Sequence, residues 1–467
     1  MFTPNDYLII AQVLPRLLGI IYLFAIGALL FQIKGLIGKN GLLPLPRYLK
    51  HLRQYFKNKP YFYMPTLFWL NSSDKTLIGL TTLGTFFAFC LIGGLYPSLM
   101  LFLLYIIYLS LIVAGQDFLS FGWEGLLLEI TAHVFLLSLA PSPNLIVWLS
   151  INFLLFRFHF QAGLVKLKSG DPNWRNLTAI AYHYQTQPLP NAIAWYAYHL
   201  PLGFHKFSAL MVFAIELILP FGIFGSEDLR TWVFIGFFSL QFMIWVTGNF
   251  SYLNHMTVVL STILLGDATL SKWFSFSLAV SGPTPLLLDL TLSLLGALLL
   301  GLQLIRLWHQ ILPNTFLKKI LQCFAPFHLA NRYTIFANMT TERYEIIIEG
   351  SQDGSIWKEY TFKYKPSEVN KRPRRIAPYQ PRLDWQTWFL PFTSFQDEEW
   401  FQSLLFHLLK GTPEVIRLLH DVPFHNPPLY MRALIYKYEF SRWEDKKRWW
   451  QRQLIGPYSP IIKLKNK

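Results

Sequence analysis

Glu129 and His133 are two ionisable residues that lie four positions apart inside an apolar stretch of the sequence. If this stretch is helical, the two side chains lie on one face and can share a proton or a hydrogen bond. Ionisable groups in apolar segments are costly, so each marks a candidate functional site. The alternative is a buried structural pair that holds two helices together. The spacing leaves both interpretations open.

Further ionisable residues lie in the neighbouring apolar stretches. Arg157 and His159 close the next stretch and could pair with Glu124 or Asp117. Alternatively, the two side chains snorkel, so that their polar ends reach the water at the membrane surface. Glu216 lies in the middle of a later stretch, four residues before a proline that can kink a helix and free a backbone carbonyl. No HExxH-type spacing accompanies these residues, so we expect no metal site and no bound cofactor.

The segment 161–206 has the densest mixture of aromatic, amide and histidine side chains in this part of the chain. Prolines within it would stiffen the backbone. Such a segment beside a membrane could be a binding surface or a lid over an active site. An interfacial loop with aromatic anchors explains the composition equally well.

The composition shows what kind of elements must position these residues. Hydrophobic residues make up 53% of the 467 residues and charged residues 14%, against about 25% charged in soluble domains. Residues 1–308 hold 17 Lys+Arg and 11 Asp+Glu, whereas the 159 residues of 309–467 hold 24 and 15. We therefore predict a transmembrane helical domain over 1–308 and a soluble C-terminal domain over 309–467. A soluble enzyme, a disordered chain and a disulfide-stapled domain are excluded.

The first domain is predicted to be a polytopic α-helical membrane bundle of about eight or nine spans, because roughly 17–25 apolar residues cross a bilayer. The candidate spans are 12–33, 76–95, 98–115, 122–140, 144–160, 207–225, 229–247, 252–266 and 284–308. The loop 34–75 is rich in Lys and Arg, which favours a cytoplasmic position by the positive-inside rule. Long domains largely escape that rule, so the orientation of the C-terminal domain stays open.

The C-terminal domain is predicted to be a small strand-rich α+β fold or a β-sandwich. Two strands, 344–349 and 357–364, flank an Asp353-Gly354 turn. Residues 400–420 have helical periodicity that is broken at 411–413, and 430–440 alternates like a strand.

Two other classes of function are disfavoured. The net charge of +15 suggests nucleic acid, but no zinc-finger spacing, aromatic nucleic-acid motif or basic helical face accompanies it. We therefore expect no nucleic-acid partner. The two cysteines, Cys90 and Cys323, form no CxxC pair, which argues against disulfide exchange by this chain.

Several long motifs closely resemble the lipase maturation factor family. They are FLSFGWEGLLLE at 118–129, GLVKL at 163–167 with WR at 174–175, YHYQTQPLPN at 182–191, NRY at 331–333, ERYE at 342–345 and RLDW at 382–385. The resemblance covers about residues 100–458. The family-motif residues are Asp117, Trp123, Glu124, Trp174, Arg175, His183, Tyr184, Gln187, Pro188, Arg382 and Asp384.

The resemblance implies a multi-pass membrane protein that assists the folding and assembly of secreted lipases. Its expected partners are membrane lipid and a client lipase or other exported protein, and its oligomeric state is not implied. The membrane would be the bacterial inner membrane or, in a eukaryote, that of the endoplasmic reticulum. A holding role requires exposed aromatic surface, for which the candidates are Trp385, Trp388, Phe389 and Trp400.

A shorter resemblance supplies an alternative function. The string AGLVK at 162–166 is similar to the segment of vitamin K-dependent gamma-carboxylases that contains their essential lysine, which matches Lys166. A lysine in a dry site can serve as a base at neutral pH. The chain would then be a membrane enzyme acting on a lipid, quinone or protein substrate with Lys166, Glu129, His133 and His183 as catalytic residues. This alternative predicts that the four side chains converge in one polar cavity.

Overall fold

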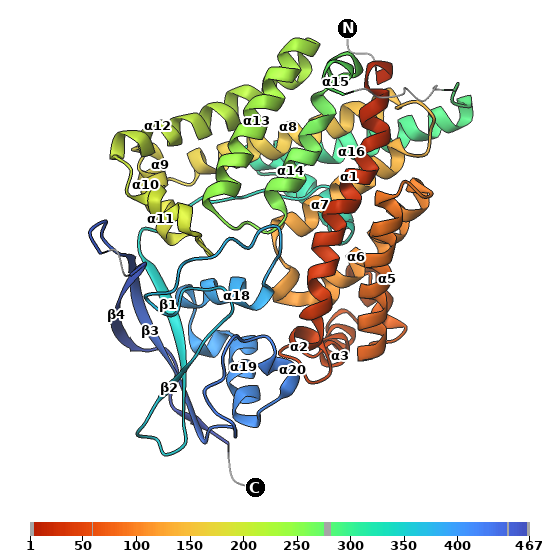
Figure 1. Ribbon diagram of the computed structural model, residues 1–467. Helices are drawn as coiled ribbons and strands as arrows, with labels where there is room; N and C mark the ends of the chain where they lie inside the picture. Colours follow the sequence, from red (N-terminus) through yellow and green to blue (C-terminus); the bar gives the residue numbers. More distant parts are fainter. Residues whose placement is uncertain (1–3, 58, 275–281, 446–447, 465–467) are drawn as a thin grey trace.

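The computed structural model describes residues 4–57, 59–274, 282–445 and 448–464. The N-terminal part is a bundle of long helices, and the C-terminal part is an antiparallel sheet with short helices beside it (Figure 1). The N-terminus lies at one end of the bundle and the C-terminal domain at the other. The predicted fold class, a polytopic helical bundle followed by a soluble α+β domain, is confirmed.

Seven helices in the described part of the chain are long and apolar enough to cross a membrane. They are Leu8–Phe31 (α1, Leu8–Gly27, with η2, Ala28–Phe31), α5 (Asp74–Ile92), Pro97–Leu119 (α6, Pro97–Gly115, with η4, Gln116–Leu119), α8 (Leu145–Lys168), Leu202–Phe224 (α12, Leu202–Phe213, with η5, Ala214–Ile218, and η6, Leu219–Phe224), α13 (Glu227–Thr247) and α16 (Leu286–Ile311).

Two of the nine expected spans correspond to shorter helices. The stretch 122–140 forms α7 (Gly122–Leu137), and 252–266 forms α14 (Leu253–Ser261) with η7 (Thr262–Leu264). Nearly every residue of α7 is buried. This helix therefore lies inside the bundle, where its length need not match a bilayer.

Polar caps set the starts of several long helices. The Asn144 side chain accepts hydrogen bonds from the backbone N–H groups of Ile146 and Val147 where α8 begins. Ser73 and Ser226 cap α5 and α13 in the same way. Each cap partners N–H groups that have no acceptor within the helix.

Short helices lie before, between and after the spans. They are η1 (Pro4–Tyr7), α2 (Ile33–Ile37), α3 (Leu45–Phe56), α4 (Pro60–Tyr63), η3 (Leu67–Trp69), α9 (Pro172–Arg175), α10 (Ala179–Thr186), α11 (Ala192–Tyr198), α15 (Asp267–Trp273), α17 (Thr315–Phe324) and η8 (Ala325–Phe327).

The C-terminal domain is built on one antiparallel sheet in the order β2-β1-β3-β4, with β5 paired to β3. The strands are β1 (Arg343–Ser351), β2 (Lys358–Tyr360), β3 (Tyr430–Phe440), β4 (Trp450–Pro457) and β5 (Ile462–Lys463). The helices are α18 (Arg382–Gln386), η9 (Thr387–Phe392), η10 (Phe395–Asp397), α19 (Glu399–Lys410) and α20 (Pro413–Ile416). The three predicted strands and the broken helix are confirmed, whereas β4, β5 and α18 were not predicted.

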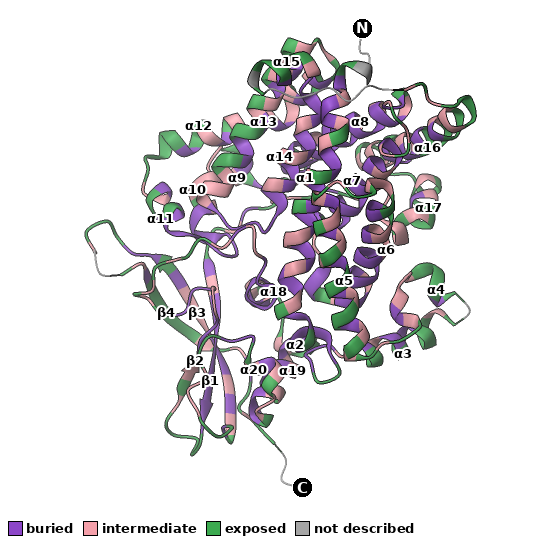
Figure 2. Ribbon diagram, turned by 45° about the vertical axis from the view of Figure 1, so that its right-hand side comes forward, coloured by how far each residue is buried: buried purple, intermediate pink, exposed green. Residues whose placement is uncertain are grey.

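The two domains share one hydrophobic core. Buried residues of the bundle and of α18 and α19 belong to a single packed cluster. Figure 2 shows the buried colour continuing from the bundle into α18. The C-terminal domain is therefore docked firmly against the end of the bundle.

The basic loop 34–75 lies on the same side of the bundle as this domain. Lys34 pairs with Glu414 at 3.2 Å, and the exposed Arg47 lies 3.6 Å from Glu399. Part of the positive charge of the loop therefore pairs with acids of the C-terminal domain. These basic residues are therefore weaker evidence for a cytoplasmic position of the loop than their number suggests.

Candidate functional site

Glu124 on α7 is bound by Arg382 of the C-terminal domain inside the protein. Arg382 Nη1 donates to Glu124 Oε1, and both side chains are at most 1% exposed. Trp123 Nε1 donates to the same oxygen at 2.9 Å, while Tyr252 Oη at 2.5 Å and Tyr108 Oη donate to Oε2. A buried carboxylate needs this many donors because it has lost its water.

Glu129, one turn and a half farther along α7, forms a second buried cluster. Arg157 Nη2 donates to Glu129 Oε1, and both side chains are fully buried. On Oε2, the backbone and side-chain nitrogens of Asn331 each donate at 2.9 Å, and Tyr333 Oη donates at 2.6 Å. Asn331 and Tyr333 belong to the C-terminal part. We call the two clusters the interdomain clamp: Glu124, Arg382, Glu129, Arg157, Asn331 and Tyr333.

Of the two interpretations left open for Glu129 and His133, the shared proton is wrong and the structural role fits, because each side chain contacts the neighbouring helix α8. His133 Nδ1 donates to the backbone oxygen of Glu129 at 2.7 Å, and its Nε2 lies 2.9 Å from Ser150 Oγ. The Glu129 carboxylate bonds instead to Arg157, Asn331 and Tyr333. Helical spacing placed both residues on α7 correctly but could not show which neighbours each would find.

The expected positions of Arg157 and His159 are also wrong. Because α8 continues to Lys168, both lie inside a span and away from its end. Arg157 pairs with Glu129, and not with Glu124 or Asp117. His159 stacks on Phe237 with ring centroids 3.7 Å apart.

The C-terminal domain also holds the turn after α10. Arg343 on β1 donates to the backbone oxygens of Gln185 at 3.0 Å, of Gln187, and of Pro188 at 2.9 Å. Gln187 Nε2 donates to the Thr247 carbonyl at the end of α13 at 2.9 Å. The 182–191 motif therefore links α10, α13 and the sheet.

The remaining family-motif residues have varied surroundings. Asp384 is buried and accepts from the backbone N–H groups of Tyr364 at 2.6 Å and of its neighbour at 3.0 Å. Trp174 Nε1 donates to the backbone oxygen of Phe336 at 3.0 Å, and Tyr184 is buried. Asp117 and Arg175 are exposed.

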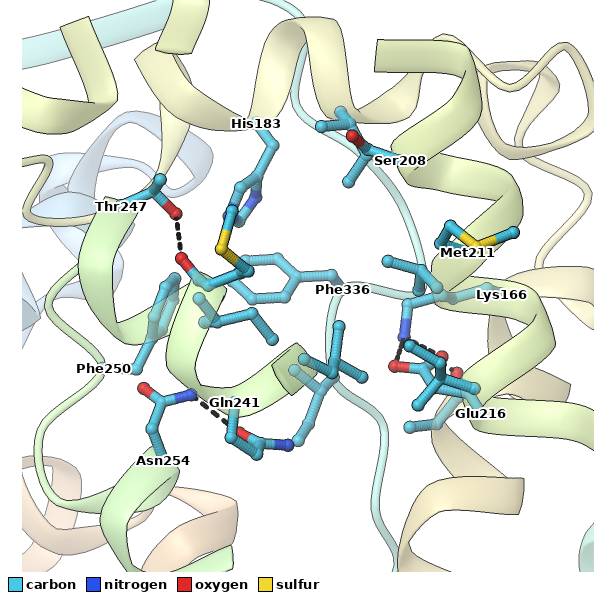
Figure 3. A pocket seen from close by; sticks show the side chains of 18 of the residues that line it. Lys166, His183, Ser208, Met211, Glu216, Gln241, Thr247, Phe250, Asn254 and Phe336 are labelled. Atoms are coloured by element: carbon cyan, nitrogen blue, oxygen red, sulfur yellow. Dashed lines mark hydrogen bonds and ion pairs between the residues drawn. The ribbon is translucent and has the colours of Figure 1, made fainter. Parts of the chain in front are cut away.

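A chamber of about 350 Å³ lies between α8, α10, α12 and α13. Lys166, His183 and Glu216 line it, together with Gln241 and Asn254. Lys166 Nζ donates to the two oxygens of Glu216 at 2.8 and 2.7 Å. Figure 3 shows this pair on one side of the chamber, His183 on another, and the two amides below.

Local irregularities bring Lys166 and Glu216 together. Residues Ala214–Ile218 form a turn of π-helix, which is common at functional sites, and the 3-10 turn with Pro220 follows. Gly163, one turn before Lys166 on α8, allows the close approach, since an added Cβ would lie 2.7 Å from a Leu217 side-chain carbon.

The four catalytic candidates of the enzyme alternative do not converge. Lys166 and His183 line the chamber, whereas Glu129 belongs to the clamp and His133 bonds to Ser150. Within the described residues, no three His, Cys, Asp or Glu side chains are grouped to hold a metal ion. Cys90 and Cys323 are both free.

The aromatic candidates for partner binding are largely covered. Trp385 is 3% and Trp400 1% exposed, so their expected exposure is wrong. Trp385 packs edge-on against Trp123, with ring centroids 5.2 Å apart, and Trp400 packs against Phe118 at 5.9 Å. Trp388 and Phe389 are half-buried, also against the bundle side. These four aromatic side chains therefore pack toward the membrane domain and do not form a free surface for a partner.

Comparison with known proteins identifies both domains. A family model described as the lipase maturation factor transmembrane domain matches residues 9–272, and one described as the lipase maturation factor C-terminal domain matches 329–460. The chain belongs to the lipase maturation factor family. The resemblance found in its motifs is thereby confirmed.

Individual members of the lipase maturation factor family match along nearly the whole chain. Human lipase maturation factor 1 is 34% identical over 97% of this chain and 87% of its own length. Mouse lipase maturation factor 2 is 32% identical over 95% of this chain and 82% of its own length. No solved structure matches the chain. Nothing in these comparisons supports the gamma-carboxylase alternative.

The clamp of this lipase maturation factor family member was only partly visible in the sequence. The sequence marks Glu124, Glu129, Arg157 and Arg382 as candidates, but it gives no sign of Tyr108 and Tyr252, the two tyrosines that donate to Glu124. One signal could have found the partnership: α7 carries two buried acids, whereas its bundle neighbour α8 supplies the clamp with one base, Arg157. The second acid then needs a base from elsewhere in the chain.

Proposed function

We propose that this protein is a membrane-embedded maturation factor that holds a partly folded exported lipase beside the membrane and assists its folding and assembly. Family membership across both domains carries the proposal. The named relatives are lipase maturation factors, and the present chain has the same two domains over most of their length. The client could also be another exported protein.

We further propose that the protein resides in the bacterial inner membrane or the endoplasmic reticulum membrane, with its C-terminal domain on the periplasmic or lumenal side. A client that is being exported folds on that side. The loop 34–75 would then face the same side, since it packs against the C-terminal domain. Its ion pairs with that domain supply a role for its basic residues that does not depend on the cytoplasm.

The surface that suits a client is an aromatic platform formed by the exposed Trp443 and Tyr196 and the half-buried Trp449, which pack on the buried Trp195. Trp443 is 57% and Tyr196 49% exposed. The Trp443 and Trp195 rings stack with centroids 5.3 Å apart. Aromatic side chains of this kind provide large contact area at low entropic cost. The platform joins α11 to the β3–β4 connection, beside the start of the span at Leu202.

The adjacent strand β4 strengthens the assignment. It pairs with β3 on one side and, among the described strands, with none on the other. Its side chains Leu454 and Ile455 are each 53% exposed. An open edge with apolar side chains can pair with an extended segment of a partly folded chain. This surface replaces the buried tryptophans as the proposed partner-binding site.

The test co-expresses a secreted lipase with the full-length protein in a host that lacks its own maturation factor. Trp443→Ser should lower secreted lipase activity several-fold, because the loss of an aromatic anchor costs about 2 kcal/mol of binding. The control is Ile356→Ser, since Ile356 is 67% exposed and lies next to β2 at the opposite edge of the sheet. Equal activity with both variants, at equal protein levels, would remove the platform from the proposal.

A further inference from the structure

The chamber opens sideways between two membrane-spanning segments. These are the span Leu202–Phe224, which begins with α12, and α13, joined by a short turn at residues 225–226. At the rim, Phe204, Phe207 and Met243 are 41%, 59% and 53% exposed. Both spans turn most of their surface outward, with only 22% of their apolar windows buried. In a bilayer the chamber is therefore reached from the hydrocarbon, which favours a lipid over a water-soluble ligand.

The walls of the chamber are mainly apolar. They include Ile180, Met211, Val212, Ile244 and Ile335. The volume of about 350 Å³ lies in the range of small-molecule sites, which is roughly 300–1,000 Å³. One acyl chain that enters between α12 and α13 would bury most of its surface against these side chains.

The charged groups in the chamber compensate one another. Lys166 contacts both oxygens of Glu216, so its ammonium group is already matched by a carboxylate. His183 is outside the spans, and its burial, reinforced by the nearby positive Lys166, lowers its pKa to about 4. His183 is therefore neutral at physiological pH. An anionic head group would find no unmatched cation here.

Two buried side chains leave acceptors without donors in the chamber wall. Asn254 is 3% exposed; its Nδ2 donates to Gln241 at 2.8 Å, but no described residue donates to its Oδ1. His159 is 1% exposed; its Nδ1 must carry the proton because it faces the Leu155 carbonyl, which leaves Nε2 as an acceptor without a described donor. Buried acceptors of this kind require donors.

We propose that the chamber binds a single-chain lipid with an uncharged, hydroxyl-bearing head group, the chemical class of a monoacylglycerol. The acyl chain lies along the apolar wall behind α12 and α13. The hydroxyl groups donate to Asn254 and His159 and exchange hydrogen bonds with the neutral ring of His183. This site is separate from the aromatic platform and does not depend on the identity of the client.

Photolabelling of the full-length protein in phosphatidylcholine vesicles tests the proposal. A diazirine-bearing monoacylglycerol should label peptides of α8, α10, α12 and α13 that line the chamber. Excess monooleoylglycerol should compete with the label, whereas excess oleate should not, because oleate brings a charge and no hydroxyl donor. Competition by oleate as strong as that by monooleoylglycerol, or labelling spread over the outer faces of the bundle, would overturn the proposal.

Paired variants separate binding in the chamber from general effects on α12. Met211→Trp fills the chamber and should reduce labelling to background, whereas Leu210→Trp, on the 49% exposed face of the same helix, should leave it unchanged. His183→Phe should weaken monoacylglycerol binding about tenfold, the effect of one or two lost hydrogen bonds, and leave methyl oleate unaffected. Unchanged labelling in a folded Met211→Trp protein contradicts the site, and equal effects on both ligands contradict the assigned role of His183.

Discussion

The interdomain clamp and the chamber each bury acids and bases within the helical domain, but their surroundings differ. In the clamp, all four carboxylate oxygens of Glu124 and Glu129 accept hydrogen bonds from protein donors, several of which belong to the C-terminal domain. In the chamber, Glu216 is held by Lys166, and the nearby Asn254 and His159 leave acceptors unmatched beside open volume.

The difference separates a structural cluster from a binding site. A buried charge must recover the solvation that it has lost, and the two carboxylates of the clamp recover it from protein donors. Arg382 Nε and Nη2 have no described hydrogen-bond partner, but Arg382 does not line the chamber. In the chamber, the unmatched acceptors of Asn254 and His159 are left for a ligand to satisfy. An ionisable residue inside a membrane protein is therefore a stronger candidate for ligand binding when its neighbours include both a cavity and an unpartnered polar atom.

The largest effect is expected from breaking the clamp. Arg382→Leu leaves Glu124 buried without its cation and should lower the free energy of unfolding by about 3–5 kcal/mol. Thermal unfolding of the detergent-solubilised protein measures the loss. The double variant Glu124→Leu with Arg382→Leu should recover much of it, because no unpaired charge is then left. A double variant that is as unstable as the single one would show that packing, and not charge, dominates there.

Removing the base of the buried ion pair should lower the stability less in the chamber than in the clamp. Lys166→Met removes the cation from Glu216, but that carboxylate borders the chamber, where it can take up a proton or contact water. We expect a loss of about 1–3 kcal/mol, in the range of one unmatched buried hydrogen-bonding group. The measurement is the same unfolding experiment. A loss equal to that of Arg382→Leu would mean that the two regions are energetically alike.

The clamp variants also change how a deletion should be interpreted. Removing residues 331–467 takes Arg382 from Glu124, and Asn331 and Tyr333 from Glu129. The structure predicts that such a truncation destabilises the bundle, so point variants on the surface are the sharper test of client binding.

What the sequence could predict depended on how local each feature is. The β1–β2 hairpin was predictable because the Asp353-Gly354 turn and the flanking alternation are contiguous, and Gly354 has the positive φ that such a turn requires. The pairing of Glu124 with Arg382 joins residues 258 positions apart, and no periodicity encodes it. The burial of Trp385 and Trp400 likewise depends on docking between the domains, which the composition of the chain does not reveal.

Two glycines allow a closer comparison of the same regions. A Cβ on Gly125 would lie 2.8 Å from Asn331 Oδ1, and the Asn331 side chain is fixed by bonds to Gly125, Glu129 and His328. A Cβ on Gly163 would meet the more adaptable Leu217 side chain. Gly125→Ala should therefore cost about 1–2 kcal/mol of stability, and Gly163→Ala less than about 1 kcal/mol. The reverse order, measured by thermal unfolding, would indicate that the chamber is the more rigidly packed region.

The smallest effect concerns the pH dependence contributed by His183. Its pKa is lowered to about 4 in the folded protein, against 6.5 in an unfolded chain. Between these values the unfolded chain binds more protons, so the contribution of His183 to stability is complete above pH 6.5 and is lost as the pH falls toward 4. Because the side chain is half-buried, we expect a change of only a few tenths to about 1 kcal/mol.

The change attributable to His183 is the difference between the wild type and His183→Phe, followed by unfolding from pH 7 to pH 5. The wild type should lose stability relative to the variant as the pH falls. Monoacylglycerol should enlarge that loss, because a ligand that binds the neutral ring adds to the stability of the unprotonated folded state. A pH dependence that is the same with and without the lipid would place the lipid away from His183. The clamp residues do not line the chamber, so the loss of stability caused by Arg382→Leu should be the same with and without the lipid.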